Sequence, residues 1–122
     1  MNQFKLLSRA IPMAASYDTK NGLLTVAQFS MNEADRDYVN AMWQIQKNPF
    51  AGDAVNAYND GPISGKQMGK FYELESSSAL VALAPGASIH HLHRTIHIKG
   101  PKHRLNKVTM KLFGVGLDAL VL

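Results

Sequence analysis

The stretch PMAASYDTKNGLLTVAQFS, residues 12–30, indicates the fold class because it has the form of a β-hairpin. Two runs suited to strands, residues 12–17 and 23–30, flank the polar loop Asp18-Thr19-Lys20-Asn21-Gly22, where Gly22 can take the left-handed backbone that a tight return needs. Side chains alternate between the two faces of a strand. In the second run one face receives Leu24, Val26 and Gln28, and the other receives Leu23, Thr25, Ala27 and Phe29. The stretch therefore predicts an antiparallel pair of strands.

Short apolar runs between turn residues continue this pattern along the chain. Asn48-Pro49, Asp60-Gly61-Pro62 and Pro85-Gly86 separate runs rich in Val, Leu, Ile, Tyr and Phe, which is typical of strands. Further strands are predicted over residues 38–46, 53–59, 71–77 and 88–99, with residues 80–83 extending the run over 71–77.

The segment over residues 101–113 has a different period. Leu105, Val108 and Leu112 lie at helical spacing, Pro101 stands near the first turn, and Gly114 provides the stop. We therefore expect a single domain, residues 1–122, that is a mostly β antiparallel β-sandwich with one C-terminal helix. The edges of such a sandwich, where they carry few charges, favour pairing with a second copy.

Composition limits the possible partners. The chain has 122 residues, 46% of them hydrophobic, which is enough for one core, and it has no Cys for disulfides or thiolate metal sites. Its net charge of +4 comes largely from the last quarter, which we interpret as a solvated helix face, so no nucleic acid partner is expected. No apolar run approaches the roughly 20 residues that cross a bilayer, so no membrane partner is expected. No glycine loop for phosphate and no nucleophile elbow is found, so no cofactor is expected, and no localisation is predicted.

A histidine-rich stretch, HHLHRTIHI at residues 90–98, is the most unusual part of the sequence. On a strand, His91, His93, Thr95 and His97 share one face, and Leu92, Ile96 and Ile98 share the other, which is predicted to be the core face. Two imidazoles two residues apart can bind one divalent metal with a third ligand. One alternative is therefore a small cupin-like metal-binding protein that uses this strand; another is a polar face of hydrogen-bonded histidines.

Two further clusters carry polar groups that could act on a ligand. Glu73 and Glu75 share a face of the strand predicted over 71–77, and a carboxylate beside imidazoles has the parts for proton transfer. The run Asn56-Ala57-Tyr58-Asn59-Asp60-Gly61-Pro62 offers amides, a phenol and a carboxylate for sugar hydroxyls, and Tyr58 or Trp43 offers a ring for the apolar sugar face. The plainer interpretations are a solvated acidic face and ordinary turn chemistry.

Several stretches together resemble a known family. They are Tyr38-Val39-Asn40 with Trp43, GDAVNAYNDGP at 52–62, FYELESSS at 71–78, LAPGAS at 83–88 and LFGVGL at 112–117. These resemble the C-terminal part of a bacterial domain-of-unknown-function family related to the galactose mutarotase-like (aldose 1-epimerase-like) supersandwich proteins.

The resemblance implies a carbohydrate site on a concave sheet face. It implies Glu75, which follows Leu74, as the general base. The family's histidine acid comes from an earlier part of the fold, so we expect His91 or His93 near the anomeric centre only as our own hypothesis for an active site. The residues that would bind or orient the sugar are Trp43, Tyr58, Asn59, Asp60, Glu73 and Arg94. The expected function is carbohydrate binding or modification, with an isomerase activity left open.

The resemblance also bears on assembly. A full supersandwich needs a considerably longer chain, so we expect either a homo-oligomer or the missing N-terminal half of a larger chain. A purely structural, oligomerising sandwich module is a further alternative.

Overall fold

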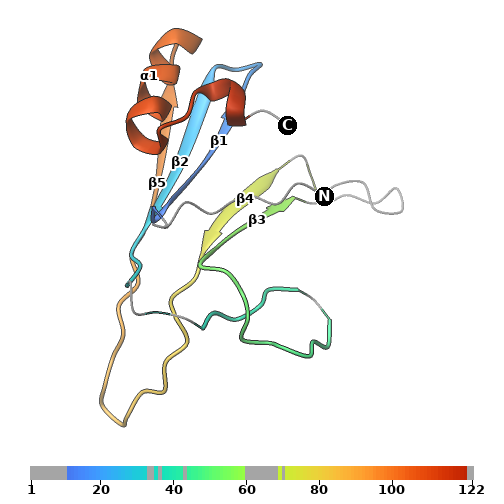
Figure 1. Ribbon diagram of the computed structural model, residues 1–122, viewed down its shortest axis with the longest axis vertical. Helices are drawn as coiled ribbons and strands as arrows, with labels where there is room; N and C mark the ends of the chain where they lie inside the picture. The colour runs from blue at the N-terminus through green and yellow to red at the C-terminus, as the bar shows by residue number, and fades with distance from the viewer. Residues whose placement is uncertain are drawn as a thin grey trace.

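The computed structural model describes residues 11–32, 35, 37–42, 44–59, 69 and 71–120. The described chain is mostly β, with two antiparallel sheets and one α-helix (Figure 1). The elements in chain order are β1 Met13–Asp18, β2 Leu23–Phe29, β3 Val55–Asn59, β4 Tyr72–Ser76, β5 His93–Lys99, α1 Lys102–Phe113 and the 3-10 helix η1 Leu117–Leu120. One sheet has the order β1-β2-β5, and the other pairs β3 with β4.

The hairpin predicted over residues 12–30 is confirmed. β1 and β2 pair antiparallel down to Asp18 opposite Leu23, and Gly22 has a φ of +60°. The Asp18 carboxylate accepts a hydrogen bond of 3.0 Å from the backbone N–H of Asn21. The loop therefore closes through the left-handed glycine that the sequence predicts and through the Asp18 side chain, which caps the turn.

β2 is the central strand of the three-stranded sheet and is buried on both faces. Leu24 and Val26, at 0% and 1% exposure, pack with Leu105 and Leu117 on the side of α1. The opposite face carries Thr25, Ala27 and Phe29, which are also buried. The apolar core cluster of the described residues draws all its members from β1, β2, β5, α1 and η1.

The second sheet lies against the face of β2 that is turned away from α1. Tyr72 of β4 accepts a hydrogen bond of 2.6 Å from the Ser16 hydroxyl and donates one of 3.5 Å to Thr25. Figure 1 shows α1 on one side of the three-stranded sheet and the pair β3 and β4 on the other. The order of layers is therefore helix, three-stranded sheet, two-stranded sheet.

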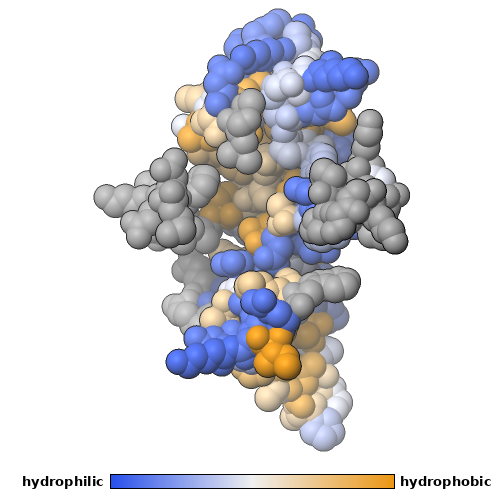
Figure 2. Space-filling model, turned by 90° about the vertical axis from the view of Figure 1, so that its right-hand side faces the viewer, coloured by the Kyte–Doolittle hydropathy of each residue, from blue (hydrophilic) through white to orange (hydrophobic). Residues whose placement is uncertain are grey.

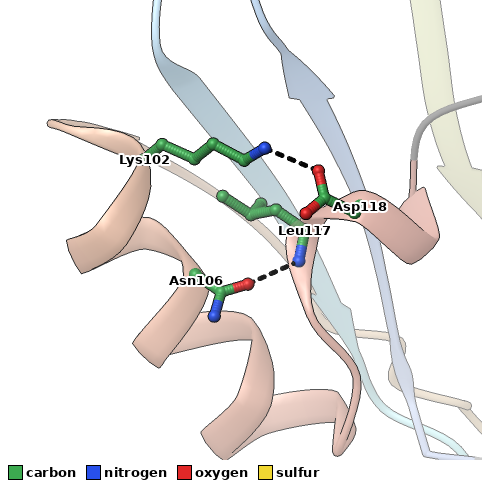
Figure 3. A network of polar contacts seen from close by, with 4 residues as sticks. All are labelled: Lys102, Asn106, Leu117 and Asp118. Carbon is green, nitrogen blue, oxygen red and sulfur yellow. Dashed lines mark hydrogen bonds and ion pairs between the residues drawn. The ribbon is translucent and has the colours of Figure 1, made fainter.

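The predicted C-terminal helix is confirmed within one residue. Pro101 precedes its first turn, and Gly114 ends it with a φ of +71° while its N–H donates to the carbonyl of Met110. Two polar contacts then join α1 to η1 (Figure 3): Lys102 Nζ lies 2.6 Å from Asp118 Oδ1, and the N–H of Leu117 donates 2.9 Å to Asn106 Oδ1.

The strand predicted over residues 38–46 is wrong. The described residues there form a loop whose one ladder contact is an isolated parallel bridge from Tyr38 to Ala51. The Gln46 side chain donates to the carbonyls of Asn40 and Met42, at 3.0 and 2.8 Å. The Gln46 side chain thus satisfies carbonyls that a neighbouring strand would otherwise pair with. The alternation of apolar and polar residues in this run is therefore not part of a sheet.

The strand extension over 80–83 is also wrong, and β5 begins at His93 rather than near residue 88. Exposed apolar side chains mark this long connection: Leu80, Val81, Leu83, Ile89 and Leu92. Ile98 packs on the core as predicted, whereas Leu92 is 59% exposed and Ile96 is 37% exposed. Figure 2 shows apolar surface on the lower part of the molecule, where the long connections lie in Figure 1.

Candidate functional site

A hollow of about 700 Å³ opens on the outer face of the two-stranded sheet. Asn56 pairs with Glu75, and Tyr58 pairs with Glu73, so these four side chains share one face. All four line the hollow, and Asp53, just before β3, joins them. The described lining also includes Asn40, Ala41, Met42, Ala57 and Phe71.

Two aromatic rings form an apolar wall of this hollow. The ring centroids of Tyr58 and Phe71 lie 6.3 Å apart with an interplanar angle of 43°, a tilted pairing. Their exposed fractions are 41% and 37%, so part of each ring remains open to a ligand. Ala41 and Met42, from the loop predicted as a strand, add further apolar surface.

Polar groups of several kinds surround the apolar wall. Asp53, Glu73 and Glu75 supply carboxylates, Asn40 and Asn56 supply amides, and Tyr58 supplies a phenol. Within the described lining no Lys, Arg or His is present. A carboxylate accepts hydrogen bonds, whereas an amide both donates and accepts, so together they suit a ligand with many hydroxyls.

The histidines predicted as partners of Glu75 lie on the other face of β4. Ser76, the next residue after Glu75, points inward, and its Oγ lies 2.9 Å from His91 Nε2 and 2.7 Å from His93 Nδ1. Consecutive residues of a strand point to opposite faces. The structure therefore brings His91 and His93 together with each other and separates them from Glu75.

Other predicted residues are also dispersed. His97 Nδ1 lies 3.0 Å from Thr25 Oγ1, apart from the other two histidines. Arg94 donates to the Gln28 side chain at 3.4 Å, on the face of the sheet that carries α1. In the described part of the chain no group of three or more His, Asp or Glu side chains is arranged to hold a metal ion.

The predicted sugar-binding residues other than Arg94 divide into three groups. Tyr58 and Glu73 line the hollow, together with Glu75. Asn59 pairs with Tyr72 and therefore shares the inner face. Trp43 and Asp60 lie outside the described residues.

Five lining residues were not predicted from the sequence: Asn40, Ala41, Met42, Asp53 and Phe71. Asn40, Ala41 and Met42 reach the hollow because they lie in a loop, which the alternating pattern concealed. Asp53 and Phe71 are the first residues of the strands predicted over 53–59 and 71–77, and their closeness to residues already singled out was the available signal.

Comparisons with known proteins identify a family but no activity. The model of a family of unknown function, DUF6786, matches residues 6–121, and the chain belongs to that family. A search of curated proteins found no match, and neither did a search of solved structures. The described part of the chain contains no helix that could span a membrane.

Proposed function

We propose that this member of the DUF6786 family is a carbohydrate-binding domain, and that its site is the hollow on the outer face of β3 and β4. The observation that carries the proposal is the combination of two part-exposed aromatic rings with carboxylates and amides around one hollow. Its volume of about 700 Å³ lies within the range of small-molecule sites, about 300–1,000 Å³.

The chemistry of a sugar suits this lining. A pyranose has an apolar face of C–H groups, which packs on an aromatic ring, and a rim of hydroxyls, which need donors and acceptors. Tyr58 and Phe71 would take the apolar face. Glu73 and Glu75 would each accept hydrogen bonds from hydroxyls, and Asn56 would both donate and accept.

Binding is favoured over isomerisation for this chain by itself. A general acid and a general base must both come within hydrogen-bond distance of the reacting sugar. Glu75 lines the hollow, but His91 and His93 contact Ser76 on the opposite face of β4. An epimerase-like reaction with a histidine acid would need that histidine from elsewhere, such as a second copy.

A second copy or further chain could also complete the architecture. We propose that the two stacked sheets form part of a larger galactose mutarotase-like sandwich, completed by a second copy or by further chain. Among the residues that the structure describes, β3 and β5 each pair with a strand on one side alone, which supports this because an unpaired strand edge accepts another strand.

Titration of the labelled protein with a panel of neutral monosaccharides, followed by NMR, tests the binding proposal. We expect saturable shifts at Tyr58, Glu73 and Glu75. Tyr58→Ala should weaken binding up to about tenfold, since an aromatic contact contributes roughly 0.5–1.5 kcal/mol. Asp118→Asn, which removes a carboxylate far from the hollow, serves as the control and should bind normally. A flat response across the monosaccharides and across a glycan array would refute the proposal.

A further inference from the structure

The inner face of β4 carries a second cluster, distinct from the hollow. His91, in the connection before β5, and His93, the first residue of β5, approach Ser76 from the same side. His91 Nε2 lies 2.9 Å and His93 Nδ1 lies 2.7 Å from the same Ser76 oxygen. Two ring nitrogens therefore converge on one point in space.

The outward nitrogens of both rings also have oxygen neighbours. His91 Nδ1 lies 3.4 Å from Ser30 Oγ, and His93 Nε2 lies 3.2 Å from Thr95 Oγ1. Ser30 Oγ is itself held in place because it accepts the N–H of Leu92 at 2.9 Å. In metal sites, a ligating histidine nearly always donates its other ring N–H to such an acceptor, which fixes the tautomer and the ring orientation.

One pair of tautomers leaves both inward nitrogens available as ligands. When both outward nitrogens carry the proton, both inward nitrogens present lone pairs toward Ser76. The Ser76 hydroxyl then donates to one of these nitrogens alone, whereas a cation between the rings uses both lone pairs.

We infer that His91 and His93 bind one divalent transition-metal ion beside Ser76. Imidazole nitrogens suit Zn²⁺, Cu²⁺ and Ni²⁺, and Cu²⁺ should bind most tightly in the Irving–Williams order. Both rings are exposed, so the ion enters from solvent, and water takes the positions that the chain does not fill. The site does not depend on carbohydrate binding, because it lies on the opposite face of β4 from Glu75.

Isothermal titration of the full chain, without an affinity tag, with CuCl₂ and ZnCl₂ tests the inference. We expect one ion per chain. His91→Ala and His93→Ala should abolish binding, whereas Thr95→Val and Ser30→Ala should weaken it about 10- to 100-fold, the usual effect of losing an outer partner. His103→Ala, on α1, and His97→Ala, whose ring contacts Thr25, are the matched controls and should bind as the unmodified chain does.

Electron paramagnetic resonance of the Cu²⁺-loaded chain gives a readout that does not depend on any variant folding. The spectrum should show coupling to two imidazole nitrogens, and this two-nitrogen signal should be lost in either single histidine variant that keeps its circular dichroism. Ser76→Ala keeps both rings and should retain the two-nitrogen signal. Absence of stoichiometric binding, a spectrum without two nitrogens, or an equal loss in His103→Ala would overturn the inference.

Discussion

Replacing Asn106 with Ala should destabilise the protein more than replacing Lys102 with Met, although both side chains hold η1 against α1 (Figure 3). The Asn106 Oδ1 atom accepts the backbone N–H of Leu117, and Leu117 is 0% exposed within the core cluster. Ala at position 106 leaves that part-buried N–H without its acceptor, which costs about 1–3 kcal/mol.

The contact of Lys102 differs because it lies in solvent. The side chains of Lys102 and Asp118 are 60% and 80% exposed, so water and salt screen the ion pair, and its loss should change stability little. The hydrogen bond to Asp118 raises the pKa of Lys102. Whatever stability the pair adds is therefore present below the pKa of an unfolded lysine and is lost as pH rises through the folded value.

Urea unfolding followed by circular dichroism measures both effects. We expect a lower midpoint for Asn106→Ala at an unchanged slope, and a nearly unchanged midpoint for Lys102→Met. Asn106→Asp, which keeps an oxygen acceptor, should recover most of the loss. Gly116→Ala should resemble Asn106→Ala, because the new Cβ would stand 2.9 Å from Asn106 Oδ1 and displace it. Equal losses for Lys102→Met and Asn106→Ala would refute this reasoning.

Three further outcomes are expected. Gly22→Ala should lower the free energy of unfolding by about 1–2 kcal/mol in the same urea titration. The reason is that φ is +60° at Gly22 and the new Cβ would stand 3.0 Å from the Gly100 carbonyl oxygen. Gly69→Ala is the control, because the nearest atom to its new Cβ lies 3.6 Å away. NMR exchange spectroscopy on α-glucose and α-galactose should show no faster anomer exchange than buffer, and an acceleration that Glu75→Gln abolishes would contradict binding without catalysis. The expected homo-oligomer stays a prediction: light scattering should give a multiple of 13.4 kDa, and a clean monomer at all concentrations would count against it.

Local signals account for the parts of the fold that could be predicted from the sequence. The hairpin depends on Gly22 and on a short loop, and α1 depends on apolar spacing between Pro101 and Gly114, so neither needs knowledge of distant segments. The strand prediction for residues 38–46 was wrong because alternation identifies a strand only where a partner strand exists. In that run the Gln46 side chain donates hydrogen bonds to the carbonyls of Asn40 and Met42 instead.

The candidate site, too, could be predicted where local signals decide and not where packing between sheets decides. The register of β3 against β4 adds Tyr58 to the face on which alternation along β4 correctly groups Glu73 with Glu75. Alternation cannot state which face of one sheet will pack on another sheet. The face of β4 that packs on the other sheet carries Ser76, which contacts His91 and His93, and it meets hydroxyls of β1 and β2. Glu75 therefore points outward.

The hydrogen bonds between the two sheets join hydroxyls and imidazoles, whereas the apolar core cluster of the described residues lies on the other side of β2. Polar contacts of this kind fix orientation but contribute little net free energy each. The two-stranded sheet is therefore held to the three-stranded sheet less strongly than the three-stranded sheet is held to α1. Amide hydrogens of β3 and β4 should exchange with deuterated solvent through partial opening, while those of β2 and α1 wait for the whole molecule to unfold.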